Sequence, residues 1–171
     1  MDDIYWGKPA RDGEEYNQAL RDLSQRRTPT VFGLRVQLPT QGRVDLPLAS
    51  TEGMTIVLKA YAGGGENALH AHQHEDHAFV VLQGSATFYG PEDRVIAELT
   101  RYQGILIPKG ALYRFHAHES ESLVMLRIGA LDAGTFLRSQ RVNEKGGKQD
   151  GFSKENKEVP VLYAVERWFQ A

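Results

Sequence analysis

The feature that most limits the possible folds of this chain is a regular alternation of short apolar runs and turn signals between Val31 and Ile128. The runs are VFGLRVQL, TIVLKAY, AFVVL, SATFYG, VIAEL, ILIP, LYRFHA and LVMLRIG, separated by turn signals such as AGGG, QGS, GPED and PKG. They are rich in β-branched and aromatic residues and recur about every 8 to 12 residues. The pattern therefore predicts an all-β antiparallel sandwich or barrel.

The segments around this region differ in character. Residues 14–27 place acidic residues first and arginines last around apolar residues at helical spacing, which predicts one amphipathic helix. Residues 139–158 are polar and rich in glycine, so we expect a mobile loop there, with a possible role as a lid. Residues 159–171 are apolar again, and we expect this tail to dock on the barrel or on a second subunit.

Composition favours a single domain over residues 1–171, with its barrel core at about residues 31–130. A chain of 171 residues with 41% hydrophobic residues can bury one sizeable core. Its formal net charge of −2 gives no basic surface for nucleic acid, so we expect no nucleic-acid partner. The chain contains no cysteine, which suits a cytoplasmic protein and leaves nitrogen and oxygen as metal ligands. Because the acidic start lacks a signal peptide and no long apolar run follows, we expect neither secretion nor a membrane span.

The histidines are strongly clustered. All six lie in two stretches, HAHQHEDH at residues 70–77 and HAH at residues 116–118. In a β-strand, side chains two residues apart point to the same face, with Cα atoms about 6.6 Å apart. His70 and His72 can therefore direct both imidazoles at one metal ion.

A third histidine is expected to join this pair from the next strand. The polar sequence QHED predicts a turn, after which His77 begins the run HAFVVLQ on the same face as Phe79 and Val81. That face is the apolar one and should point into the barrel. The residues thus predict a metal site formed by His70, His72 and His77.

This stretch resembles the first motif of the cupin superfamily, GxxxxxHxHxxxxExxxxxxG. Gly64, His70, His72 and Gly84 fall in register, while His77 stands at the glutamate position. The resemblance implies a cupin barrel, that is, an antiparallel double-stranded β-helix or jelly roll. It also implies one divalent transition metal, which could be Fe, Mn, Co, Ni or Zn.

The second cupin motif, GxxxxxPxGxxHxxxN, is degenerate in this chain. Pro108 and Gly110 match it, but Tyr102, Tyr113 and Ala117 replace its glycine, histidine and asparagine. Tyr113 thus stands where a fourth ligand is usual, as a ligand, a catalytic proton donor or a plain core aromatic. Because a phenol is longer than an imidazole, we favour a position beyond the ion, where Tyr113 would fix a substrate or a water.

The remaining histidines have weaker assignments. His74 is expected to be an exposed turn residue, and a rival metal set of His72, His74 and His77 ranks second because it breaks the register with the motif glycines. His116 and His118 should face outward by strand parity, although a β-bulge could turn His116 inward. Solvated charge is the expected role of four further residues: Glu66, Glu75, Asp76 and Arg127.

Three functions are compatible with these residues. The first is a metalloenzyme of dioxygenase, lyase or isomerase type that acts on a small anionic or oxygenated molecule. The second is a non-catalytic cupin that binds a small ligand or a metal. The third is a metal-free barrel similar to sugar epimerases, with His72 or His77 as base and Tyr113 as acid, which the convergent histidines disfavour. A homodimer is expected because the apolar tail could supply an interface.

Overall fold

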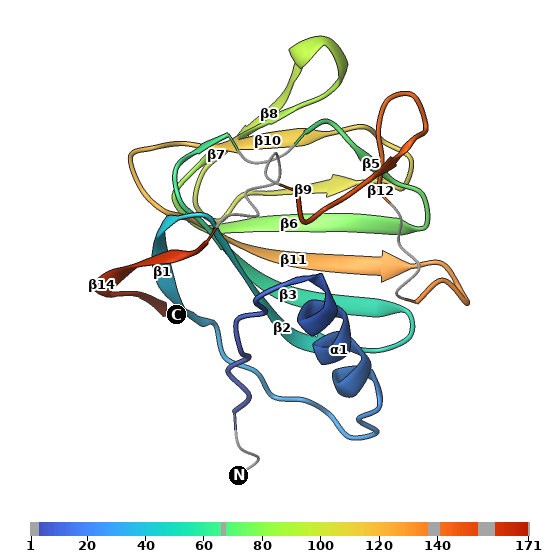
Figure 1. The fold of residues 1–171 in the computed structure, drawn as a ribbon, viewed down its shortest axis with the longest axis vertical. Helices are drawn as coiled ribbons and strands as arrows, with labels where there is room; N and C mark the ends of the chain where they lie inside the picture. The colour runs from blue at the N-terminus through green and yellow to red at the C-terminus, as the bar shows by residue number, and fades with distance from the viewer. Residues whose placement is uncertain (1–3, 66–67, 137–140, 154–159, 171) are drawn as a thin grey trace.

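The computed structural model describes residues 4–65, 68–136, 141–153 and 160–170. Two antiparallel sheets form a barrel (Figure 1). One has the strand order β2 (Arg43–Ser50), β3 (Met54–Tyr61), β11 (Leu123–Leu131), β6 (Glu75–Gln83) and β9 (Gly104–Ile107). The other has the order β4 (Gly64–Gly65), β10 (Arg114–Ala117), β7 (Ala86–Tyr89) and β8 (Val95–Leu99), with the 3₁₀ turn Pro91–Asp93 between β7 and β8. The predicted all-β antiparallel fold is confirmed.

Two smaller sheets complete the architecture. One joins β13 (Lys148–Gln149), β12 (Arg141–Val142) and β5 (Ala71–His72). The other is a ribbon of β1 (Arg35–Gln41) and β14 (Leu162–Gln170), which projects from one side of the barrel in Figure 1. The first of these sheets therefore connects a late segment of the chain to the histidine strand β5.

Strand alternation gives the five-stranded sheet two different faces. Its inner face contributes to an aromatic core inside the barrel, which includes Tyr61, Phe79, Phe88, Phe115 and Met125. Its outer face packs against the ribbon in a second core, which includes Val36, Leu46, Leu58, Val124 and Phe169. Both faces of the sheet are thus buried, and any polar group on the inner face must find a partner there.

Helix α1 (Gly13–Ser24) confirms the helix that the sequence predicts, although it ends before the predicted Arg27. Asp12 caps it by accepting a hydrogen bond from the Glu15 backbone N–H at 2.8 Å. Leu20 and Leu23 are buried, and the helix packs against β2 (Figure 1). Among the described residues, no helix is long and apolar enough to cross a membrane.

Strand β2 is not among the runs that the sequence pattern predicts. Pro47 interrupts it, and the pairing with β3 shifts register between Pro47 and Ala49. Proline is uncommon inside a sheet because it removes a ladder hydrogen bond, so the segment 43–50 does not read as a strand. The omission matters because β2 supplies the buried Arg43 and Asp45 to the barrel interior.

The structure describes the segment 139–158 only in part, whereas it describes most of the apolar tail 159–171. In the segment 139–158, the described part forms β12 and β13, whereas residues 139–140 and 154–158 lie outside the described residues. The mobility expected there stays a prediction. The apolar tail docks on β1 through β14, with Phe169 buried but Val165 and Trp168 exposed. The expected homodimer also stays a prediction.

Candidate metal centre and pocket

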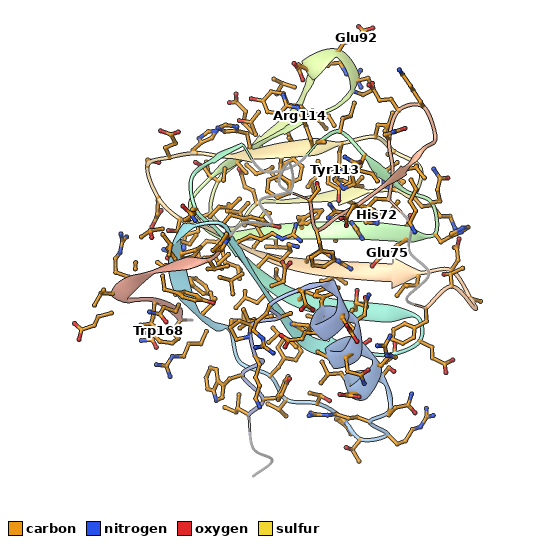
Figure 2. The ribbon with its side chains drawn as sticks, in the orientation of Figure 1. His72, Glu75, Glu92, Tyr113, Arg114 and Trp168 are labelled. Atoms are coloured by element: carbon orange, nitrogen blue, oxygen red, sulfur yellow. The ribbon has the colours of Figure 1, made fainter. Side chains whose placement is uncertain are left out.

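The three predicted histidines lie together in the barrel. His72 lies on β5, His77 on β6, and His70 forms an isolated bridge with Tyr113. All three are buried, with ring centroids 5.2 Å apart for His70 and His72 and 4.1 Å apart for His72 and His77. In Figure 2, His72 and Tyr113 occupy the same region inside the barrel. Strand spacing therefore predicted this convergence correctly.

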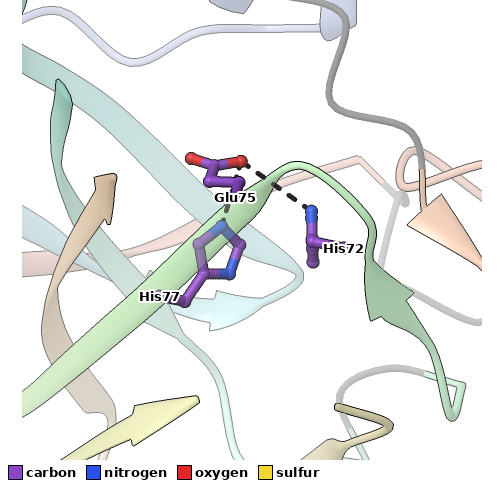
Figure 3. A group of neighbouring side chains, drawn as sticks. All are labelled: His72, Glu75 and His77. Atoms are coloured by element: carbon purple, nitrogen blue, oxygen red, sulfur yellow. Dashed lines mark ion pairs between the residues drawn. The ribbon is translucent and has the colours of Figure 1, made fainter. Parts of the chain in front are cut away.

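Three buried side chains, those of His72, Glu75 and His77, have potential ligand atoms that all lie within 4.8 Å of one another (Figure 3). We call these three residues the donor group, and Glu75 is its carboxylate. Glu75 Oε2 lies 3.1 Å from His77 Nε2 and 3.8 Å from His72 Nδ1. Strand β6 begins at Glu75, so Glu75 and His77 are two residues apart on the same inward face. With 4% of its surface exposed, Glu75 is not the solvated charge that we expected. Asp76 is half-buried on the alternate face, and Glu66 lies outside the described residues.

The His70 ring is fixed through one nitrogen, which leaves the other nitrogen able to bind a metal or accept a hydrogen bond. Its Nδ1 lies 2.8 Å from the carbonyl oxygen of Ala68, and a carbonyl can only accept, so Nδ1 carries the proton. Its Nε2 is buried without a hydrogen-bond partner among the described residues. Metal-binding histidines commonly have this arrangement, because the donated N–H fixes the ring and frees the other nitrogen. His70 is not part of the donor group, so its role as a ligand stays a prediction.

Tyr113 contacts the opposite side of the His77 ring. Its hydroxyl lies 3.1 Å from His77 Nδ1, while its ring packs 6.0 Å from the ring of Phe79. Without a metal, the nearby Glu75 carboxylate favours the proton on His77 Nε2, so that Nδ1 accepts from the phenol. A metal on Nε2 would leave the proton on Nδ1, which would then donate to the phenol oxygen. Tyr113 therefore contacts the His77 ring, while its position beyond an ion and its catalytic role stay predictions.

An arginine fixes the orientation of Glu75. Arg127 Nη2 donates to Glu75 Oε1 and also to Thr55 Oγ1 at 2.8 Å, while its Nη1 donates to the Tyr16 hydroxyl at 3.0 Å. With Oε1 bound in this way, Oε2 is the oxygen directed at the histidines. Arg127 was also expected to be solvated, but its side chain is only 11% exposed. Helix α1 thus reaches the donor group through Tyr16 and Arg127.

Gly129 makes room for this network. A Cβ at this position would lie 1.9 Å from Glu75 Oε1 and 2.6 Å from Thr55 Oγ1. We expect Gly129→Ala to displace Glu75 and to lower the free energy of unfolding by about 1–3 kcal/mol, with weaker metal binding. Urea denaturation and metal titration test this. Gly53→Ala is the control, because a Cβ there meets nothing within 4 Å, and equal behaviour of the two variants would contradict the packing argument.

Burial keeps the three histidines neutral. It lowers the pKa of His70 and of His72 well below the ordinary value, and the positive charge of Arg141 acts in the same direction on both. Burial, followed by the charge of Arg127, lowers the pKa of His77 to about 4. A neutral imidazole is the form that binds metals, so all three rings are in the competent state at neutral pH.

The donor group borders a cavity of about 800 Å³. His72 and Glu75 line it together with Tyr16 and Leu20 of α1. The segment that carries β12 and β13 contributes Arg141 and residues 148–152. A cavity of this size suits a small organic molecule, since ligand pockets usually measure about 300–1,000 Å³.

A second group of charges lies in the same cavity, around Asp45. Its carboxylate lies 2.7 Å from Lys59 Nζ and 3.2 Å from Arg43 Nε, and all three side chains are buried. Burial alone would raise the pKa of Asp45, but the charges of Lys59 and Arg43 outweigh it and lower that pKa strongly. Burial lowers the pKa of Lys59 to about 8, although Asp45 opposes the shift. The ion cluster holds β2 and β3 together on the inner face.

This cluster predicts an acid-sensitive fold. Because the pKa of Asp45 is lower in the folded state than its ordinary value of 3.8, its contribution to stability is present above pH 3.8 and is lost as the pH falls below that value. We expect the urea midpoint to drop between pH 5 and pH 3, and to drop less in Asp45→Asn. An equal loss in both proteins would show that other carboxylates cause the effect.

The other histidines lie outside the donor group. His74 is exposed, with Nδ1 3.7 Å from Asp132 Oδ2, so it does not join His72 and His77 in the rival set. His116 faces away from the buried Phe115 and Ala117 by strand alternation, as expected. His118 contacts the hydroxyls of Ser85 and Thr87 at 3.0 Å and 2.9 Å.

Comparison with known proteins agrees with this architecture. The sequence matches no protein-family model and no curated protein. The Cnp3 cupin domain of Schizosaccharomyces pombe superposes with a TM-score of 0.50 over 56% of this chain and 69% of that chain, at 16% identity. KdgF from Halomonas sp. gives 0.47 over 54% and 82%, at 21% identity. A double-stranded β-helix protein from Klebsiella pneumoniae gives 0.47 over 66% and 82%, at 17% identity.

The topology and the Cnp3 match together identify the fold. Two antiparallel sheets form the barrel, with His72 on β5 and His77 on β6. The chain therefore has the double-stranded β-helix fold that cupin structures have. Proteins of one fold can differ widely in activity, so the function of this chain must be argued from the site itself.

Proposed function

We propose that this protein is a metal-dependent cupin enzyme that acts on a small oxygenated or anionic molecule in the barrel cavity. The observation that carries the proposal is the buried donor group of His72, Glu75 and His77 at the edge of a cavity of about 800 Å³. Nitrogen and carboxylate donors suit Fe, Mn, Co, Ni or Zn. The proposed ion would be held by His72, Glu75 and His77, with His70 as a further nitrogen donor.

The donor set fits a metal in two respects. The buried Nε2 of His70 has no hydrogen-bond partner among the described residues, which is unusual for a buried polar atom and is explained by a ligand. The carboxylate that the cupin motif lacks at residue 77 is supplied by Glu75, two residues earlier on the same face. A mixed imidazole and carboxylate set is thus present, although its members differ from the expected three histidines.

Bound at this group, such an ion would polarise a substrate oxygen or, for iron, offer adjacent positions to substrate and dioxygen. The protein's own residues orient the carboxylate and hold a proton near the site. Arg127 directs the Glu75 carboxylate, and the Tyr113 hydroxyl holds a proton beside His77 Nδ1. Neither Tyr113 nor His77 lines the cavity, so Tyr113 would act on a substrate only through His77 and the Glu75 carboxylate, which does line it. Dioxygenase, lyase and isomerase reactions all suit these parts.

A second candidate is proton transfer without a metal. It is favoured by the chain of contacts from the Tyr113 hydroxyl to His77 Nδ1 and from His77 Nε2 to Glu75 Oε2, each 3.1 Å long. A phenol, an imidazole and a carboxylate in this order can hold a base in one tautomer. We rank it second because it gives no role to His70 and His72.

Metal analysis combined with turnover assays tests the proposal. The untagged protein is purified without added metal, its metal content is measured, and oxygen uptake and product formation are followed with small carboxylates, diketones and catechols. We expect near one equivalent of a transition metal, and turnover that chelation abolishes and the same metal restores. Turnover that survives chelation would support the metal-free candidate. A metal-loaded protein that binds but converts none of these compounds would indicate a binding function.

A further inference from the structure

The cavity beside the donor group carries a surplus of positive charge. Five basic residues line it, against three acidic ones. The basic residues are Arg43, Lys59, Arg127, Arg141 and Lys148, and the acidic ones are Asp45, Glu75 and Asp150. The difference, five minus three, is two positive charges, without any contribution from histidine or metal. Inside a concave site of low dielectric, a surplus of this size attracts anions.

Arg141 is the basic residue best placed to act with the donor group. Strand β12 pairs with β5, and Arg141 stands directly opposite His72. Cross-strand partners have their side chains on the same face, with Cβ atoms about 4.5–5.5 Å apart. After burial, the charge of Arg141 is among the causes that lower the pKa of both His70 and His72. The guanidinium is therefore close to the predicted metal ligands.

A second part of the cavity lining is polar as well. Asp45, Lys59 and Arg43 form the buried ion cluster there, on strands β2 and β3 of the sheet that also carries Glu75. Ammonium, guanidinium and carboxylate groups can together bind hydroxyl groups of a ligand as donors and acceptors. A molecule in the cavity would thus meet a cationic group near His72 and a mixed polar surface around Asp45.

We propose that the cavity binds a small hydroxylated carboxylate, with Arg141 as the residue that holds its carboxylate beside His72. Arg141 suits this role because a guanidinium binds a carboxylate through two parallel hydrogen bonds. The ligand's hydroxyl groups would face Lys59 and Asp45. The proposal rests on the proposed function for what is done to this molecule, but its binding does not require the metal.

Calorimetric titration with gluconate tests this, with sorbitol as the neutral molecule of matched shape and glucose 6-phosphate as an anion of another class. We expect gluconate to bind and sorbitol not to bind at the same concentrations. Arg141→Gln should weaken gluconate binding by roughly tenfold or more, as for other hydrogen bonds to charged groups. Arg101→Gln is the control, because it removes one positive charge from an exposed position outside the cavity lining.

Several results would overturn the proposal. They are equal affinity for sorbitol, no measurable affinity for gluconate, binding of glucose 6-phosphate alone, or wild-type affinity in Arg141→Gln. Repeating the titration on chelated protein separates the two proposals. Gluconate binding that depends on Arg141 in a protein unable to hold metal would contradict the proposed function alone. A metal-loaded protein with no affinity for gluconate would contradict the carboxylate site alone.

Discussion

His72→Ala and His77→Ala are each expected to lose most of the bound metal. Both side chains belong to the donor group and both are buried, so removing either imidazole leaves an unfilled ligand position inside the barrel. Residues that only orient a ligand typically change metal affinity by about 10–100-fold, and we expect a larger effect from a direct ligand. Metal content after dialysis and a competition titration with a chelator give the measurement.

His74→Ala is the matched control for both variants. It removes an imidazole two residues from His72, but from an exposed side chain that contacts Asp132. We expect its metal content to equal that of the wild type. Metal loss in His74→Ala together with full occupancy in His72→Ala would mean that the donor group in this structure is not the binding site.

Two further variants decide how the site is composed. Glu75→Gln keeps the shape of the side chain but removes the charge that faces His72 and His77, and we expect it to lower metal affinity by about 10–100-fold or more. His70→Ala should have a comparable effect if its free Nε2 is a ligand. Full metal content in Glu75→Gln with loss in His70→Ala would restore the three-histidine site that the sequence alone predicts.

Strand alternation explains why the sequence could predict His77 but not Glu75. The buried Phe79 and Val81 set the inward parity of β6, and counting back two residues gives His77. The same count continued by two gives Glu75. The sequence does not indicate this continuation, because QHED is polar and polar runs usually mark turns. Glu75 remains in the strand because Arg127 supplies the opposite charge that its burial requires.

The sequence alone could not predict the ion cluster around Asp45, for a different reason. Taken singly, Arg43, Asp45 and Lys59 are each most often found in water. Only the pairing of Asp45 with Lys59 across β2 and β3 shows that they neutralise one another inside the barrel. That pairing depends on residues 43–50 forming a strand in register with β3. Pro47 argues against a strand when the sequence alone is considered.

The same cluster gives the largest expected effect on stability. Asp45→Asn leaves the charges of Lys59 and Arg43 buried without their carboxylate, and removing one partner of a buried ion pair costs about 3–5 kcal/mol. That is a large part of the roughly 5–15 kcal/mol by which most domains are stable. Urea denaturation at pH 7 should therefore show a strongly lowered midpoint.

Two comparisons show whether buried charge, rather than the altered side chain, causes this loss. Asp93→Asn makes the same substitution in the exposed pair with Arg114, where surface pairs contribute about 0–1 kcal/mol, so its midpoint should barely change. Adding Lys59→Met to Asp45→Asn removes one of the two cations that lose the Asp45 carboxylate and should recover part of the loss, because an apolar side chain of similar length avoids the cost of burying a charge. If the double variant is instead less stable than Asp45→Asn, buried charge is not the cause of the loss. The contact of the Lys59 ammonium with the Tyr61 ring, whose centroid lies 5.6 Å from Nζ, would then outweigh the cost of burying that ammonium.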